Sequence, residues 1–228
     1  MSGEIMGTIV VPVLNEGLAI DQCIRDLLAA TQTHWKVVVC DGGSQDDTLQ
    51  RLSAYPINVI SSRPGRALQM NAGARMAEGP MLVFIHADTR LPVDFNVLMK
   101  AFLAQDAQWG RFDVMLDNPR WPYRMIAWFM NRRSALTGVC TGDQTFFMRR
   151  DFFLQLQGFA ELPLMEDVEF SLRARKQSVP FRIKQPVMTS ARRWSKHGVF
   201  KTMMLMWWLR LAYRLGVSPR RLHAWYYG

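Results

Sequence analysis

The first ninety residues alternate apolar, β-branched runs with segments of helical periodicity. Four runs predict strands: Thr8–Val13, Val37–Cys40, Ile57–Ile60 and Met81–Ile85. The segments between them predict helices at Leu18–Ala30, around Leu49 and Leu52, and at Ala67–Met76. Strands that are apolar throughout and are separated by helices are typical of a parallel sheet covered on both faces. The sequence therefore predicts an α/β fold with a mostly parallel central sheet.

The second half of the chain is less regular but continues the mixture of strands and helices. We expect strands at Trp109–Leu116, Thr145–Met148, Phe181–Lys184 and Val187–Ser190. We expect helices at Pro92–Gln105, Trp121–Leu136, Glu166–Lys176 and Gly198–Leu215. The chain has no repeat and no clear linker, and 228 residues suffice for one substantial core. The sequence thus predicts a single domain with helices at its C-terminal end.

The amino-acid composition limits which partners and which cellular compartment the protein can have. A formal net charge of +9 suits a phosphate-rich ligand, a nucleic acid or an anionic membrane, and does not choose among them. The three widely spaced cysteines form no disulfide or metal pattern, which favours a reducing compartment. There is neither a secretory signal nor a run of about 20 apolar residues. We expect a cytoplasmic protein, either soluble or attached to the inner face of a membrane.

Polar side chains follow the predicted strands at the edge where parallel sheets bind ligands. They are Asn15 and Glu16, Asp41, the segment Ser61–Arg66, and His86 with Asp88. We expect them to meet in one crevice. A carboxylate such as Asp41, followed by Gly-Gly-Ser, can accept hydrogen bonds from a base or a ribose hydroxyl. A capped turn without a ligand explains the same four residues equally well.

Two of these sites suit a diphosphate. Arg63 and Arg66 flank a Pro-Gly turn at a helix N-terminus, where both the helix dipole and the guanidinium geometry favour anions. Asp88 follows a buried strand and can hold Mg²⁺ or Mn²⁺, which would bridge diphosphate oxygens. The alternative for Arg63 and Arg66 is a surface turn without a ligand, and the alternative for Asp88 is a helix cap.

Three further sites lie in the second half. The acids Glu166 and Asp167 begin a helix, which the helix dipole partly explains, and one of them suits a general base. The turn containing Asp143 and Gln144 could ligate an acceptor, a sugar or a diphosphate, or be an ordinary turn. The segment Arg192–His197 predicts a basic loop that is either solvated or closed over a diphosphate. In that loop Arg193 and Trp194 would contact the acceptor or the diphosphate, and His197 could add a metal or phosphate contact.

Taken in order, these motifs resemble those of the family 2 inverting glycosyltransferases, which have the GT-A fold. The resemblance extends from Ile9 to about Trp194 and is carried by Val11–Glu16, Asp41–Ser44, Arg66–Gly73, Phe84–Thr89 and Glu166–Glu169. The segments Gly142–Gln144 and Pro163–Asp167 resemble more narrowly a bacterial subgroup assigned to arsenosugar biosynthesis.

The resemblance implies a role for each matching residue. It places Pro12, Asn15, Glu16 and Ala87 around the nucleotide, Asp41 at the base, which is usually uracil, and Arg66 near the phosphates. It implies Asp88 as the metal ligand, Asp167 as the catalytic base, and Glu166 near the acceptor or the diphosphate. Position 86 departs from the family pattern: the family usually has the first Asp of its Asp-x-Asp motif there, and this chain has His86. The missing carboxylate weakens the expectation of Mg²⁺ or Mn²⁺. The implied reaction moves a sugar, with inversion, from a UDP-sugar to an acceptor hydroxyl.

The same resemblance divides the domain by function. Residues 1–90 would form the nucleotide-binding half, residues 91–195 the acceptor-binding and catalytic half, and residues 196–228 a helical extension.

Two other classes of protein remain as alternatives. A nucleotidyltransferase has a similar sheet, but its Gly-rich basic loop is replaced here by the acidic Leu14–Gly17. A dehydrogenase is disfavoured further, because no Gly-x-Gly-x-x-Gly follows a strand. A non-catalytic basic protein on a membrane surface is favoured by the Met/Trp rows among the arginines of residues 196–221. Core packing or a homodimer contact explains those rows as well, and we expect no nucleic-acid partner.

Overall fold

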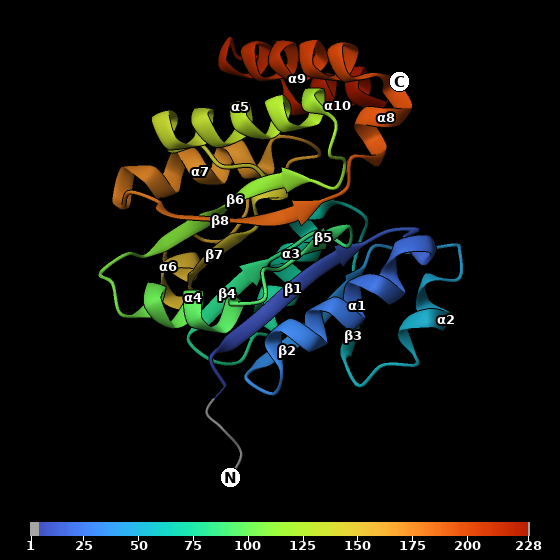
Figure 1. Cartoon of the computed structure of the whole chain (residues 1–228), viewed down its shortest axis with the longest axis vertical. Helices are drawn as coiled ribbons and strands as arrows, with labels where there is room; N and C mark the ends of the chain where they lie inside the picture. The colour runs from blue at the N-terminus through green and yellow to red at the C-terminus, as the bar shows by residue number, and fades with distance from the viewer. Residues whose placement is uncertain (1–4, 228) are drawn as a thin grey trace.

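The structure, a computed structural model, describes residues 5–227 apart from the side chain of His197, and is built on one curled sheet (Figure 1). The sheet has the strand order β3-β2-β1-β4-β7-β6-β8-β5. The strands are β1 (Gly7–Val13), β2 (Trp35–Asp41), β3 (Asn58–Ser61), β4 (Met81–Phe84), β5 (Thr89–Arg90), β6 (Trp109–Leu116), β7 (Phe146–Arg149) and β8 (Phe181–Thr189). β7 and β5 run antiparallel to their neighbours, and the other pairs are parallel. The predicted mostly parallel sheet is confirmed.

Helices cover both faces of the sheet, as predicted. One core cluster gathers apolar residues of α1 (Gly17–Thr31), α4 (Phe95–Leu103) and α5 (Trp121–Thr137). The second cluster gathers those of α3 (Arg66–Arg75), α6 (Arg150–Gln155) and α7 (Glu166–Gln177). The short α2 (Thr48–Leu52) lies against α1. Gly73 brings α3 close to the sheet, since a Cβ there would collide with the side chains of Val10 and Cys40.

Two local predictions were wrong. The expected strands Phe181–Lys184 and Val187–Ser190 are one strand, β8, whose pairing with β6 shifts register next to Pro186. Proline lacks the amide donor that a regular ladder needs, and an irregularity accommodates it. The expected loop Arg192–His197 is a helix, α8.

The C-terminal helices form a layer over one end of the domain (Figure 1). They are α8, α9 (Val199–Arg214) and α10 (Pro219–Tyr227). A third apolar cluster joins Leu209 and Leu222 of this layer to Met165 and Val168 at the start of α7. Among the described residues, none of the helices combines the length and the apolar character that crossing a bilayer requires.

Candidate active site

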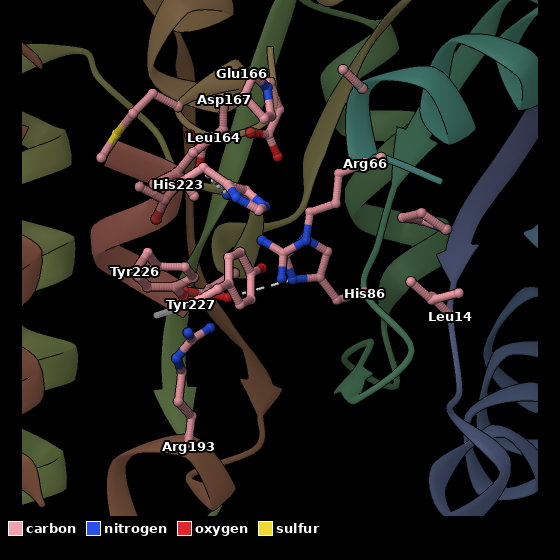
Figure 2. A pocket seen from close by; sticks show the side chains of 18 of the residues that line it. Leu14, Arg66, His86, Leu164, Glu166, Asp167, Arg193, His223, Tyr226 and Tyr227 are labelled. Carbon is pink, nitrogen blue, oxygen red and sulfur yellow. Dashed lines mark hydrogen bonds and ion pairs between the residues drawn. The ribbon is translucent and has the colours of Figure 1, made fainter. Parts of the chain in front are cut away.

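A cavity of about 1210 Å³ lies where strands β1 and β4 end, between the sheet and the C-terminal layer. Figure 2 shows its labelled side chains converging from both sides. Most of the residues singled out from the sequence line it: Pro12, Glu16, Arg66, Ala87, Asp88, Asp143, Glu166, Asp167, Arg193 and Trp194. The predicted crevice at the carboxyl ends of the strands therefore exists.

Two predicted nucleotide ligands, Asp41 and Asn15, are not part of the cavity wall. The buried carboxylate of Asp41 accepts hydrogen bonds from the amides of Gly43 (2.9 Å) and Ser44 (3.1 Å), so it holds its own turn. Asn15 is exposed, with a φ of 55°, and its side-chain oxygen accepts from the amide of Gln45 at 2.8 Å. Both side chains shape adjoining loops, and their contacts with a base or ribose stay predictions.

Gln144 is also absent from the cavity wall. It is fully buried, and its side-chain oxygen accepts a hydrogen bond from the Ser134 hydroxyl at 2.5 Å. Gln144 therefore ties the turn at Gly142–Gln144 (η1) to helix α5 and has no free group to offer a ligand there. The proposed metal contact of His197 lies outside the described side chains.

Gln69 is a functional position that the sequence analysis missed. Its buried side-chain amide donates to the carbonyl oxygens of Val13 (2.7 Å) and Cys40 (2.8 Å) at the ends of β1 and β2. These bonds fix the start of α3 against the strand ends and so position Arg66, one turn earlier. The available signal was a polar residue among the apolar side chains Ala67 and Met70 on the buried side of the helix.

Arg66 carries a permanent positive charge into the cavity, opposite Glu166 and Asp167 (Figure 2). Loss of hydration lowers the pKa of Arg66, but its interactions with the acids Glu166 and Asp143 and with the Tyr227 phenol outweigh this effect and raise the pKa above its usual value. A cation held here without a direct ion pair among the described residues suits an incoming phosphate.

His86, which departs from the motif expected from the resemblance, pairs with a carboxylate from a distant turn. Its Nδ1 lies 3.4 Å from Oδ1 of Asp143, and Gly142 leaves no room for a Cβ beside the imidazole ring. Loss of hydration raises the pKa of Asp143, but the interactions with His86, Arg66 and Arg210 outweigh this effect. The pKa of Asp143 is therefore lowered to about 2. A charged carboxylate therefore stands beside position 86, supplied by a distant turn instead of the strand end.

Asp167 and Glu166 are neighbours in different surroundings at the start of α7. The Asp167 carboxylate is partly exposed and accepts hydrogen bonds from the amides of Gly142 (3.0 Å) and Val168 (2.7 Å). These bonds orient a carboxylate toward the cavity. Glu166 is 5% exposed, and burial together with the charge of Asp167 raises its pKa. Asp167 is thus the better placed of the two to act as a base.

The raised pKa of Glu166 makes a stability prediction for Glu166→Gln. Because the folded state holds this proton more tightly than the unfolded state, ionisation of Glu166 destabilises the fold as the pH rises above about 4.5. The variant should therefore be more stable than wild type by about 1–3 kcal/mol at pH 8, and the gain should vanish at pH 4. Urea unfolding at both pH values measures this. An equal gain, or none, at the two pH values would contradict the assigned environment of Glu166.

Asp88 fits a metal ion that binds together with a diphosphate. Its Oδ1 lies 3.4 Å from the hydroxyls of Thr89 and Thr189, and none of the described cations pairs with it. Mg²⁺ and similar ions are commonly held by one or two protein carboxylates plus substrate phosphates. The described residues contain no group of three or more His, Cys, Asp or Glu side chains that would bind an ion alone. Asp88 is therefore suited to share an ion with the ligand.

The C-terminal layer contributes cavity residues that the sequence analysis also missed. Arg210, His223, Tyr226 and Tyr227 line the cavity, and the Arg193 guanidinium lies 3.8 Å from the centre of the Tyr226 ring. Arg192 contacts Glu16 at 3.3 Å, which joins α8 to the loop after β1. One feature of the sequence could have revealed these residues: no Asp or Glu follows Glu169, so the C-terminal segment that forms one wall of the cavity is basic.

The chain is similar to bacterial glycosyltransferases in sequence. It is 25% identical over 181 residues to a PGL/p-HBAD biosynthesis glycosyltransferase of Mycobacterium bovis, which covers 74% of this chain and 69% of that protein. It is 25% identical over 146 residues to the uncharacterized glycosyltransferase YibD of Escherichia coli. That match covers 59% of this chain but only 41% of the relative.

Solved structures share the fold. Staphylococcus aureus TarS 1-349 in complex with UDP-GlcNAc has a TM-score of 0.64 and 19% identity, with 80% of this chain and 58% of that chain covered. The mannosyltransferase PcManGT of Pyrobaculum calidifontis, in complex with GDP-Man and Mn²⁺, has a TM-score of 0.62 and 21% identity over 80% of this chain and 55% of that one. This chain thus spans little more than half of these structures.

The family assignment rests on a match over about two thirds of the chain. The profile described as "Glycosyl transferase family 2" matches residues 8–158, which include β1, the start of α3 and the Asp88 strand end. The match agrees with the order of motifs in the sequence and with the sheet that carries them. This chain belongs to glycosyl transferase family 2.

Proposed function

We propose that the chain transfers a sugar, with inversion, from a nucleoside diphosphate donor, a UDP-sugar, to an acceptor hydroxyl. The observation that carries this proposal is the shared cavity of Arg66, Asp88 and Asp167, which come from three distant segments. A phosphate-binding cation, a metal-compatible carboxylate and a hydrogen-bonded carboxylate are the groups that such a displacement needs. The family assignment favours this reaction over nucleotidyl transfer.

The leaving-group side is basic. Arg66 and Arg193 enter the cavity from opposite walls (Figure 2) and would pair with the diphosphate as negative charge develops on it. Asp88 would hold the divalent ion, which supplies Lewis-acid stabilisation of the departing diphosphate. The Mn²⁺ in the similar mannosyltransferase structure supports this choice of ion for the proposal.

The acceptor side contains Asp167. Its carboxylate would remove the proton of the acceptor hydroxyl as that oxygen attacks the anomeric carbon, and the nucleoside diphosphate would leave from the opposite face. One base and one displacement give inversion. The two backbone amides that bind Asp167 fix its direction and reduce the reorganisation needed in the reaction.

Thermal unfolding with nucleotides tests the proposal. UDP or a UDP-sugar with Mn²⁺ should raise the Tm by about 5 °C at a concentration of about 100 Kd, because ligands of the folded state stabilise it. GDP and GDP-sugars, measured in parallel, establish the choice of base. If no nucleoside diphosphate or nucleotide sugar moves the Tm with or without Mn²⁺, the proposal is wrong.

The finer predictions stay open to test alongside this one. The relatives named above carry other biosynthetic names, so the arsenosugar subgroup stays a prediction from Gly142–Gln144 and Pro163–Asp167. Cytoplasmic location, and membrane or homodimer contact through residues 196–221, also stay predictions. The exposed Phe200, Trp207 and Trp208 among basic residues support such contacts.

A further inference from the structure

A second, smaller cavity adjoins the first between helices α5 and α9. We call it the side pocket; its volume is about 260 Å³. Its walls are apolar, with Ile126, Phe129 and Met130 on α5 and Met203, Met206 and Trp207 on α9. Asp143, Trp194 and Arg210 line both cavities, so the side pocket opens beside the proposed reaction site. An apolar cavity of about 150 Å³ already accommodates benzene, so an aromatic ring fits here with room to spare.

The side pocket contains a buried guanidinium group with unfilled hydrogen-bonding positions. Nε and Nη2 of Arg133 are buried and have no hydrogen-bond partner among the described residues. Burial and the charge of Arg210 lower the pKa of Arg133 to about 10, although the charges of Asp167 and Asp143 act in the opposite direction. Burial also lowers the pKa of Arg210. Buried polar groups without partners are rare in proteins. Asp143 supplies one negative charge to the two guanidinium groups of this pocket, and an anionic ligand would supply the acceptors that the Arg133 nitrogens lack.

The far end of the side pocket reaches the surface. Phe129 is 40% exposed and Trp207 is 49% exposed, and their rings meet edge to face with centroids 6.3 Å apart. The pocket therefore runs from Asp143, at the main cavity, past Arg133 to an exposed aromatic rim. A ligand in it would have an apolar body, an anionic group, and one end near Asp143 and Arg210.

We propose that the side pocket binds the sugar acceptor and that the acceptor is an amphipathic anion, with an aromatic or aliphatic body between α5 and α9 and a carboxylate or phosphate at Arg133. That the ligand is the sugar acceptor rests on the proposed function, whereas the binding of an amphipathic anion does not. It separates two sets of cations: Arg66 and Arg193 serve the donor diphosphate, and Arg133 serves the acceptor.

Binding of defined probes to the full chain tests the charge. The probes are 4-butylbenzoate, 4-butylphenyl phosphate, the uncharged methyl 4-butylbenzoate, and acetate and inorganic phosphate as anions without an apolar body. Calorimetry should show at least about tenfold tighter binding of an amphipathic anion than of the ester, and no binding of acetate. Any binding of inorganic phosphate should occur at the donor site, and Arg133→Met should leave it unchanged. Whichever of the two amphipathic anions has the lower Kd identifies the anionic group of the acceptor as a carboxylate or a phosphate.

Two matched pairs of variants locate the site. Arg133→Met should remove the preference for the anions and leave ester binding unchanged, whereas Arg132→Met, at the exposed neighbouring position, should bind like wild type. Trp207→Ser should weaken both the anions and the ester, and Trp208→Ser should weaken neither, because Trp208 does not line the pocket. Arg133→Met should also raise the Tm of the unliganded protein, since it removes buried guanidinium nitrogens that have no hydrogen-bond partner among the described residues.

The outcomes separate this inference from the proposed function. If UDP with Mn²⁺ raises the Tm but no amphipathic anion binds, or Arg133→Met binds the anions as tightly as wild type, the acceptor inference is wrong and the donor site stands. If the anions bind through Arg133 but no nucleotide does, the pocket stands and the glycosyltransferase proposal fails.

Discussion

Replacing Asp167 by Asn should lower the kcat of sugar transfer by about 10³-fold and leave the Kd for the donor nearly unchanged. The carboxamide keeps the size of the side chain and can still accept a hydrogen bond from Gly142 or Val168, but it cannot take a proton from a hydroxyl. General-base catalysis typically contributes about 10²- to 10⁴-fold, and almost all of it would be lost. Release of UDP in the presence of acceptor measures kcat, and calorimetry with the donor measures Kd.

The control for Asp167 is Glu161→Gln. Glu161 is another acid lining the same cavity, but it is exposed and lies outside α7. Its loss alters the local charge without removing the proposed base, so transfer should stay within a few-fold of wild type. Transfer by Asp167→Asn at the wild-type rate would refute the role of Asp167, whatever the control shows.

The second large effect is expected from Asp88→Asn, which should lower kcat/KM by about 10²-fold and abolish the effect of Mn²⁺ on donor binding. An amide binds divalent ions much more weakly than a carboxylate, and the described residues around the cavity offer no three-ligand group to replace it. A metal ion at a leaving group contributes several kcal/mol to transition-state stabilisation. Thermal shifts with UDP, with and without Mn²⁺, check the binding part separately from the rate.

For this experiment Asp106→Asn is the matched control, because Asp106 is an exposed acid that does not line the cavity. It should keep both the rate and the difference that Mn²⁺ makes. If Asp88→Asn retained the same dependence on Mn²⁺ as the control, the ion would be bound elsewhere or not at all.

The wall of the cavity that the strand ends form could be predicted because local sequence determines it. A run such as Met81–Ile85 reveals its strand, and parallel strands place the residues that follow them, here Asp88, at a common edge. Arg66 follows by the same argument, since it begins the helix after the third strand. These side chains meet through topology alone.

The other wall depends on contacts that no local pattern specifies. The segment Arg192–His197 is polar enough for a loop, yet it forms α8 between β8 and α9. The turn at Asp143 approaches His86 only because β7 inserts between β4 and β6. The sequence predicts a ligand at Gln144 because this residue lies next to Asp143. Adjacent residues of this turn point in different directions, however, and the side chain of Gln144 is buried in the core.

The burial of Cys23, Cys40 and Cys140 has a practical consequence for following the C-terminal layer in solution. All three are free, and burial raises the pKa of each thiol to about 12, so they should not react with maleimide dyes at neutral pH. A single cysteine introduced by Lys196→Cys, at an exposed position of α8, would then carry the label alone. A change in its emission on addition of UDP would show that α8 moves against the loop after β1, which Arg192 contacts through Glu16.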